Sequence, residues 1–140
     1  MNIAVVGSGL IGQAWAIVFA RGGHTVKMWD GDPKAVGNAL TLIASQVADL
    51  KAAELIDDPK VLIARIGGCR TLEEVLAGAE YVQESIPERV EMKKEIFGRM
   101  DKIASPTAVL ASSTSSIPAS SFTEYLPGRA RCVIAHPVNP

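Results

Sequence analysis

Several features that identify whole classes of protein are scarce in this sequence. Charge of one sign is not in excess, because 14 Lys and Arg stand against 15 Asp and Glu, giving a formal net charge of −1. Such a balance provides no electrostatic footprint for nucleic acid or for an anionic membrane. We expect neither as a partner.

Cysteine is nearly absent. The two that occur, Cys69 and Cys132, lie far apart and form no Cys-x-x-Cys pair, so the sequence predicts neither a zinc site nor a disulfide framework. We expect no bound metal, and two reduced thiols in a cytoplasmic protein.

The sequence also lacks a long uninterrupted hydrophobic run. The segment 3–20 is nearly all apolar, but three glycines interrupt it and no basic residue precedes it. This pattern favours a buried strand that continues into a buried helix over a signal peptide or a membrane span. With 140 residues, 48% of them hydrophobic, the chain is predicted to be one globular domain.

What the sequence does contain is a regular alternation of strand and helix patterns. Short apolar runs ended by turn residues predict strands, and apolar residues at three- and four-residue spacing predict helices. Strands are predicted at 3–6, 25–30, near 66, 81–86, 107–111 and 131–135, with helices at 10–21, 33–56, 59–64, 72–76, 88–103 and 118–122. Parallel strands need crossovers, so the alternation predicts an α/β fold: a doubly wound, mainly parallel sheet with helices on both faces.

Two of these helices have recognisable start signals. Asp32 followed by Pro33 fits an N-cap with proline at the first helical position. Thr71, with Glu74 three residues later, fits a capping box in which each side chain bonds the other residue's backbone amide.

A glycine-rich turn follows the first predicted strand and precedes the first helix. It reads Gly7-Ser8-Gly9-Leu10-Ile11-Gly12, the Gly-x-Gly-x-x-Gly pattern of Rossmann-type dinucleotide-binding folds. Gly7 permits the tight turn, Gly9 lets the backbone approach a diphosphate, and Gly12 lets helix and strand pack closely. The free amides of Leu10 and Ile11 at the helix N-terminus would then bind the phosphates.

An acidic residue ends the second predicted strand. Asp30 stands 18 residues after Gly12, where this fold places a carboxylate against the adenosine ribose. It would accept hydrogen bonds from both ribose hydroxyls and repel a 2′-phosphate. The sequence therefore predicts NAD as the cofactor in preference to NADP.

Further motifs extend a family resemblance along the whole chain. They are Gln83-Glu84-Ser85-Ile86-Pro87-Glu88, the run of Ser and Thr at 112–116, and His136-Pro137-Val138-Asn139-Pro140. With the glycine turn and Asp30, they resemble the 3-hydroxyacyl-CoA dehydrogenase family. The lambda-crystallin branch, which includes L-gulonate 3-dehydrogenase, shares Gln-Glu-x-x-Pro-Glu and His-Pro-Val-Asn-Pro.

The resemblance implies roles for particular residues. His136 would be the catalytic base, since imidazole titrates near neutral pH and can take up the alcohol proton. Ser115 would hydrogen-bond the reacting oxygen beside the nicotinamide, and Asn139 would help to hold that end of the site. Glu88 and Lys93 would lie near the nicotinamide ribose. The reaction implied is hydride transfer from a secondary alcohol to NAD.

The resemblance also implies what residues 1–140 are. They would form the NAD-binding domain, and the family's helical domain, which completes the substrate pocket and the homodimer, would not be among them. Alone, this domain is expected to bind NAD without useful catalysis. The small-molecule substrate stays open between a hydroxy acid such as L-gulonate and a 3-hydroxyacyl-CoA, because acyl-CoA enzymes usually carry His-Phe-Phe-Asn-Pro.

Two other functions are compatible with part of the pattern. A cofactor-binding or structural module without catalysis, as crystallin relatives suggest, would keep the glycine turn and Asp30. A serine hydrolase using Ser115 and His136 is the other, but the sequence contains no Gly-x-Ser-x-Gly elbow.

Overall fold

The computed structural model describes residues 1–138 and contains one six-stranded, all-parallel sheet. The strands are β1 (Asn2–Val6), β2 (Thr25–Trp29), β3 (Ile66–Gly68), β4 (Tyr81–Glu84), β5 (Val109–Ser112) and β6 (Cys132–Ile134). The helices are α1 (Leu10–Arg21), α2 (Ala35–Ala52), α3 (Pro59–Ala64), α4 (Leu72–Leu76), α5 (Val90–Ile103) and α6 (Ser120–Thr123), with a 3₁₀ turn at Arg129–Arg131.

The strand order is β3-β2-β1-β4-β5-β6. From β1 the chain builds outward through β2 and β3, then crosses back to place β4 on the other side of β1 and builds outward again. The order therefore reverses between β1 and β4, where open parallel sheets bind their ligands beyond the carboxyl ends of the strands. The predicted Rossmann-type fold is confirmed.

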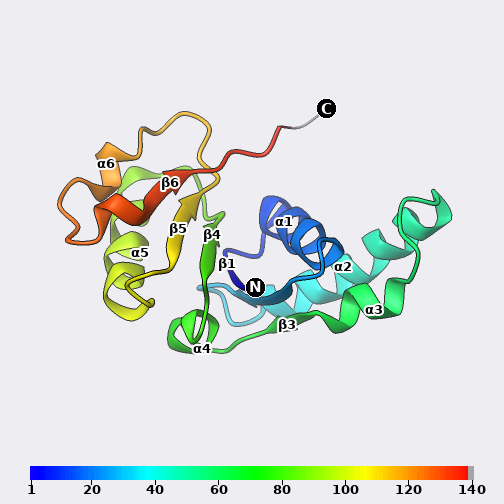
Figure 1. Ribbon diagram of the computed structural model, residues 1–140. Helices are drawn as coiled ribbons and strands as arrows, with labels where there is room; N and C mark the ends of the chain where they lie inside the picture. The colour runs from blue at the N-terminus through cyan, green and yellow to red at the C-terminus, as the bar shows by residue number, and fades with distance from the viewer. Residues whose placement is uncertain (139–140) are drawn as a thin grey trace.

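Helices cover both faces of this sheet, as Figure 1 shows, and each face has its own apolar core. On one face, residues of α1, α2 and α3 pack on β1 and β2 around Val5, Met28 and Ile43, which are 0%, 0% and 1% exposed. On the other, α4, α5 and α6 pack on the sheet around Phe97 and Phe122, whose rings lie 4.8 Å apart. Strands buried on both faces explain the continuous apolar runs in the sequence.

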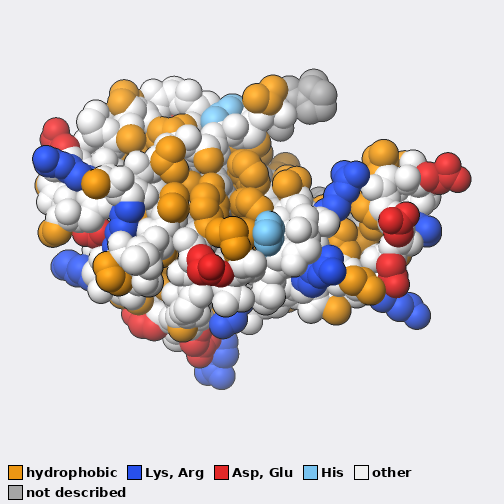
Figure 2. Space-filling view, in the orientation of Figure 1, with side chains coloured by type: hydrophobic (Ala, Val, Ile, Leu, Met, Phe, Trp, Pro, Cys, Tyr) orange, Lys and Arg blue, Asp and Glu red, His pale blue; other side chains and the backbone are white. Residues whose placement is uncertain are grey.

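Figure 2 shows how side chains are distributed on one face of the molecule. Hydrophobic side chains gather in the middle of that face, between α1 and β5, and the charged ones lie around the periphery with both signs interspersed. Among the described residues, no helix combines the length and the apolar character that crossing a membrane requires.

Local signals set several element boundaries correctly. The capping box is present, with Thr71 Oγ1 accepting from the Glu74 amide at 3.1 Å and Glu74 Oε2 accepting from the Thr71 amide at 3.4 Å. α3 begins at Pro59, as predicted, behind an Asp58 side chain that accepts from the amides of Lys60 and Val61.

Other boundaries differ from the prediction. α2 begins at Ala35, not at Pro33, because the Asp32 carboxylate accepts from the Lys34 amide at 2.9 Å in a turn that precedes the helix. β4 ends at Glu84 and α5 begins only at Val90. Glu88, predicted to open α5, therefore lies in the loop between them.

Candidate functional site

The glycine turn between β1 and α1 shows a separate steric reason for each glycine. Gly7 has φ +100°, and a Cβ there would lie 2.7 Å from the carbonyl oxygen of Ser85. A Cβ on Gly12 would lie 2.0 Å from the carbonyl oxygen of Gly7. Gly9 differs, because a Cβ there would have no neighbouring atom within 4 Å. Two glycines are thus required by the protein's own packing, and Gly9 leaves open space above the turn.

Backbone amides at the start of α1, next to that open space, are left without partners in the helix. The first hydrogen bond of the helix runs from the Gln13 amide to the Gly9 carbonyl at 2.9 Å. The amides of Leu10, Ile11 and Gly12 therefore have no partner within the helix. They carry the partial positive charge of the helix N-terminus, so this position favours an anionic group.

Asp30 follows β2 and lies directly beside the turn. Its Oδ2 accepts from the backbone amide of Ser8 at 2.7 Å and from the Ser8 hydroxyl at 2.9 Å, and its Oδ1 accepts from the Asp32 amide at 3.0 Å. A carboxylate has about four acceptor positions, so roughly one remains for a ligand, and a second becomes available if the Ser8 hydroxyl turns away. The carboxylate is held rigidly at the edge of the cleft.

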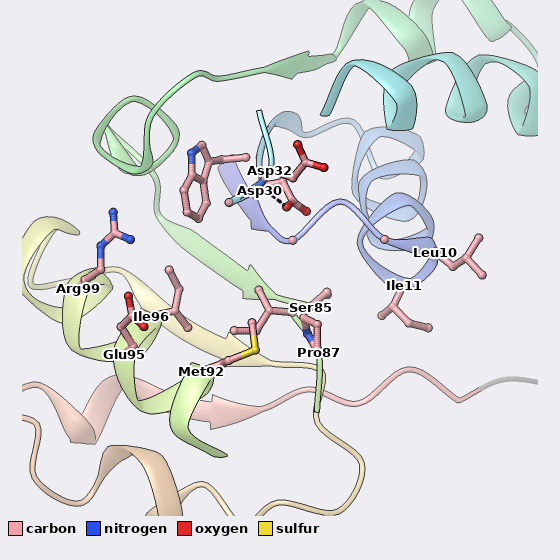
Figure 3. A pocket seen from close by; sticks show the side chains of 15 residues that line it. Leu10, Ile11, Asp30, Asp32, Ser85, Pro87, Met92, Glu95, Ile96 and Arg99 are labelled. Carbon is pink, nitrogen blue, oxygen red and sulfur yellow. Dashed lines mark hydrogen bonds between the residues drawn. The ribbon is translucent and has the colours of Figure 1, made fainter. Parts of the chain in front are cut away.

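A cleft of about 690 Å³ opens above these groups, within the usual size of a small-ligand site. Figure 3 shows its lining side chains, with Asp30 and Asp32 beside the glycine turn and Met92, Ile96 and Arg99 on α5 opposite. Other lining residues are Gly7, Gly9, Leu10, Ile11, Trp29, Gly31, Ser85, Ile86, Pro87 and Glu95.

The sequence pattern did not indicate that α5 forms one wall of the cleft. Met92, Ile96 and Arg99 follow a four- and three-residue spacing that puts them on one face of the helix, and all three line the cleft. Arg99 also lies over the ring of Trp29, 5.8 Å from its centroid. The helical spacing was available in the sequence, but nothing in it indicated which side of α5 faces the cleft.

A second pocket of about 300 Å³ adjoins the first and contains most of the remaining predicted residues. Ser115, Glu88, Lys93 and His136 all line it. Ile11, Ser85 and Ile86 line both pockets, so the two pockets are neighbours that share one wall at the carboxyl edge of the sheet. Asn139, predicted to help hold this end of the site, lies outside the described residues.

Glu88 organises the loop that carries Ser115. Its Oε1 accepts from the Thr114 hydroxyl, from the Ser115 amide at 3.2 Å and from the Ser116 amide at 3.3 Å. Burial acts to raise the pKa of Glu88, but these hydrogen bonds and the nearby Lys93 ammonium outweigh it, and the pKa is lowered from its usual value. Glu88 is therefore an ionised anchor of the serine loop.

Lys93 belongs to a buried ion pair that the sequence did not reveal. Its ammonium lies 2.9 and 3.0 Å from the two carboxylate oxygens of Glu84, and the two side chains are 1% and 0% exposed. Glu84 also accepts from the Ser112 hydroxyl and the Ile86 amide, and Lys93 lies 3.6 Å from Glu88. Glu84 satisfies Lys93 within the protein and fixes α5 to the ends of β4 and β5. The signal available for Glu84 was a carboxylate inside the strand predicted at 81–86, because a charge buried in a sheet needs a partner.

The arrangement fits a dinucleotide. An anion site at the start of α1 lies between a carboxylate at one end and a pocket with an imidazole and a hydroxyl at the other. Leu10 and Ile11 would hold the diphosphate, Asp30 the adenosine ribose, and the pocket of Ser115 and His136 the reactive end.

Comparison with known proteins agrees with a dinucleotide-binding domain. Residues 2–140 match the protein family described as "3-hydroxyacyl-CoA dehydrogenase, NAD binding domain". The chain is 38% identical over 142 residues to a lambda-crystallin homolog of Bos taurus, covering 99% of this chain and 44% of the relative. It is 36% identical over 139 residues to an L-carnitine dehydrogenase of Streptomyces griseus, covering 99% of this chain and 41% of the relative. The chain thus spans less than half the length of these relatives.

Solved structures give the same picture. A 3-hydroxybutyryl-CoA dehydrogenase of Escherichia coli superposes with a TM-score of 0.93 at 26% identity, covering 100% of this chain and 30% of that one. An (S)-3-hydroxybutyryl-CoA dehydrogenase of Ralstonia eutropha superposes with a TM-score of 0.91 at 28% identity, covering 99% of this chain and 49% of that one.

Proposed function

The chain belongs to the 3-hydroxyacyl-CoA dehydrogenase family as its NAD-binding domain, and from this we propose that the intact protein oxidises the 3-hydroxyl of a small hydroxy acid. The family resemblance inferred from the motifs is confirmed, and NAD is the cofactor of such domains. The observation that carries the proposal is that the pocket lined by His136 and Ser115 shares Ile11, Ser85 and Ile86 with the cleft lined by Asp30.

Each residue would have a defined task in this reaction. NAD, when bound, would supply the hydride acceptor, and the residues of the second pocket would hold its reactive end. His136 takes the proton of the substrate hydroxyl, and the exposed Ser115 hydroxyl hydrogen-bonds the same oxygen and orients it. Glu88 keeps the Ser115 loop in place through its bonds to the backbone amides. Positioning and proton transfer are thus supplied by the protein.

The substrate class is narrowed by the motif that contains His136. His-Pro-Val-Asn-Pro supports the branch shared with lambda-crystallin, and a relative named L-carnitine dehydrogenase is 36% identical. L-Carnitine, like L-gulonate, carries a hydroxyl on the carbon β to a carboxylate. We propose a free 3-hydroxy acid first and a 3-hydroxyacyl-CoA second, acted on by a cytoplasmic homodimer of the intact protein.

The test begins with cofactor binding and proceeds to turnover. Calorimetric titration of the chain with NAD should give saturable heat, and absence of heat at millimolar NAD contradicts the proposal. The intact protein should reduce NAD with L-gulonate, L-carnitine or 3-hydroxybutyryl-CoA, followed by absorbance. His136→Gln should lower kcat by roughly 10² to 10⁴ with NAD affinity retained, and His24→Gln, in the turn before β2, is the matched control. Unchanged turnover in His136→Gln would refute the role of that histidine.

The second candidate is a non-catalytic role. The 38% identity to a lambda-crystallin homolog supports it. An NAD-binding module without catalysis would still bind NAD through α1 and Asp30. NAD binding without turnover of any hydroxy acid or hydroxyacyl-CoA by the intact protein would support this second candidate.

A further inference from the structure

Two serine hydroxyls meet where the two pockets join. Ser85 follows β4 and Ser113 follows β5, and their Oγ atoms lie 2.9 Å apart. Ser85 lines both pockets, and Ser113 lines the second. From the distance alone, either hydroxyl could donate to the other. The surrounding partners decide which one does.

The orientation of the Gln83 amide is fixed first. One of its terminal atoms lies 3.2 Å from the carbonyl oxygen of Ala135, which can only accept. That atom must therefore be the nitrogen, Nε2. The other, Oε1, accepts from the Tyr81 hydroxyl at 2.7 Å. Gln83 Nε2 then donates to Ser113 Oγ at 2.7 Å.

Ser113 receives a second donor from α1. The indole Nε1 of Trp15 lies 3.0 Å from Ser113 Oγ, and an indole nitrogen can only donate. A hydroxyl oxygen has two lone pairs, and Gln83 and Trp15 occupy both. The single hydroxyl hydrogen of Ser113 must then go to Ser85 Oγ.

The hydroxyl hydrogen of Ser85 is consequently left without an acceptor in the protein. Within residues 1–138, Ser113 Oγ is the hydrogen-bond partner of Ser85 Oγ, and Ser85 is partly exposed at the junction of the pockets. A hydroxyl that accepts one hydrogen bond is also a better donor, because hydrogen bonds in a chain polarise one another.

We propose that Ser85 is a hydrogen-bond donor to the dinucleotide, directed into the cleft by Trp15, Gln83 and Ser113. The inference rests on the proposed cofactor site. The ligand atom is an oxygen of the segment that follows the diphosphate, which is the ribose on the nicotinamide side, because Ser85 and Ile11 line both the first pocket and the second. Ser85 is thus a binding residue for the reactive half of the cofactor.

The test compares ligands that end at different points of the dinucleotide. By calorimetry, Ser85→Ala should bind NAD and ADP-ribose roughly 5- to 10-fold more weakly than the unsubstituted chain, the usual value of one lost hydrogen bond. It should bind ADP equally well, because ADP lacks the second ribose. Ser85→Cys keeps a side chain of similar size but has only a weak donor. It should therefore lose about as much affinity for NAD and ADP-ribose as Ser85→Ala does. Ser45→Ala, at an exposed serine on α2, is the control.

A double substitution separates this role from a structural one. Ser113→Ala leaves Gln83 and Trp15 with unpaired donors and should lower the Tm. Ser113→Ala should weaken NAD binding in a chain that retains Ser85. In a chain that already carries Ser85→Ala it should cause no further loss of affinity, since the two serines act through one hydrogen bond. Additive losses of affinity would overturn the proposal.

The outcomes also distinguish this inference from the proposed function. If the unsubstituted chain fails to bind NAD, the proposed function itself is contradicted. If it binds NAD and Ser85→Ala binds NAD equally tightly, only the role of Ser85 is overturned. A loss for ADP as large as that for NAD would overturn the assignment to the second ribose.

Discussion

At the scale of single residues, glycines of one motif have different roles. Gly12 is required by packing, because its Cα lies against the Gly7 carbonyl, whereas Gly9 borders open space. Stability and ligand binding should therefore respond to different substitutions in the same turn.

The matched pair Gly9→Ala and Gly12→Ala tests this separation. Gly12→Ala should lower the free energy of unfolding by roughly 3 kcal/mol or more, since a backbone atom 2.0 Å from the new Cβ must move. Gly9→Ala should cost less than about 1 kcal/mol while weakening NAD binding by roughly tenfold or more. Urea unfolding and calorimetry measure the two effects, and equal destabilisation by both substitutions would contradict the distinction.

Glu88 predicts a pH dependence at the same scale. Hydrogen bonds and Lys93 lower its pKa in the folded protein despite the opposing effect of burial, so the folded state binds the proton less readily than the unfolded chain. The stabilisation is present above the unfolded pKa of about 4.3 and is lost as pH falls through the lower, folded pKa.

The free energies of unfolding of the unsubstituted chain and of Glu88→Gln should approach each other as the pH falls. The unsubstituted chain should be more stable than Glu88→Gln at pH 6, and the difference should shrink as pH falls from about 5 to below 4. Denaturant midpoints at several pH values measure it. Glu91→Gln, at a side chain that is 85% exposed, is the control on α5. A difference that grows toward acid would contradict the sign.

At the scale of elements, the site depends on how α5 is fixed to the sheet. The Glu84–Lys93 pair is fully buried and joins the end of β4 to the first turn of α5. Removing one partner of such a pair leaves an uncompensated buried charge, whereas removing both is tolerated much better.

Lys93→Met should therefore lower the free energy of unfolding by roughly 3–5 kcal/mol. The double variant Lys93→Met, Glu84→Gln should recover part of that loss, because no buried charge remains. Lys94→Met, one residue along the same helix at a 41% exposed side chain, should stay within about 0.5 kcal/mol. Thermal or urea unfolding measures the stability of all three variants. A double variant less stable than Lys93→Met would contradict the view that an unpaired buried charge causes the loss.

At the scale of the whole molecule, the cleft is a product of topology. β1 and β4 are neighbours with crossovers that leave in opposite directions, so the loops after them separate and leave space between α1 and α5. A ligand that binds only the folded state in this space stabilises the whole domain by mass action.

NAD should accordingly raise the Tm. At a concentration of 100 Kd it should add about 2.7 kcal/mol to the free energy of unfolding. NADP should do so much less at equal concentration, because the Asp30 carboxylate lines the cleft and would repel a 2′-phosphate held beside it. Asp30→Ala should reduce the difference between the two nucleotides, in a thermal shift series with Asp49→Ala on α2 as control. Equal shifts for NAD and NADP in the unsubstituted chain would contradict the assigned role of Asp30.

Much of this architecture could be predicted locally. Strand and helix positions follow from periodicity, and the capping box at Thr71 depends on residues three apart in the chain. Predictions were wrong where a side chain could form either of two sets of hydrogen bonds. Asp32 could cap a helix directly or form a preceding turn, and it forms the turn. Glu88 could open α5 or bond the serine loop, and it bonds the loop.

The α/β alternation, the unpaired amides at the start of α1 and the carboxylate that follows β2 could all be recognised in the sequence, because each depends on residues close together in the chain. The three-dimensional arrangement was needed to show that Glu84 neutralises Lys93, that α5 forms a wall of the cleft, and that the hydroxyl hydrogen of Ser85 has no acceptor among the described residues. Those outcomes need groups far apart in the chain, such as Trp15, Gln83 and Ser113, to meet in one place. Hydrogen-bond direction is decided by which donors and acceptors surround an atom, and a linear pattern does not contain that information.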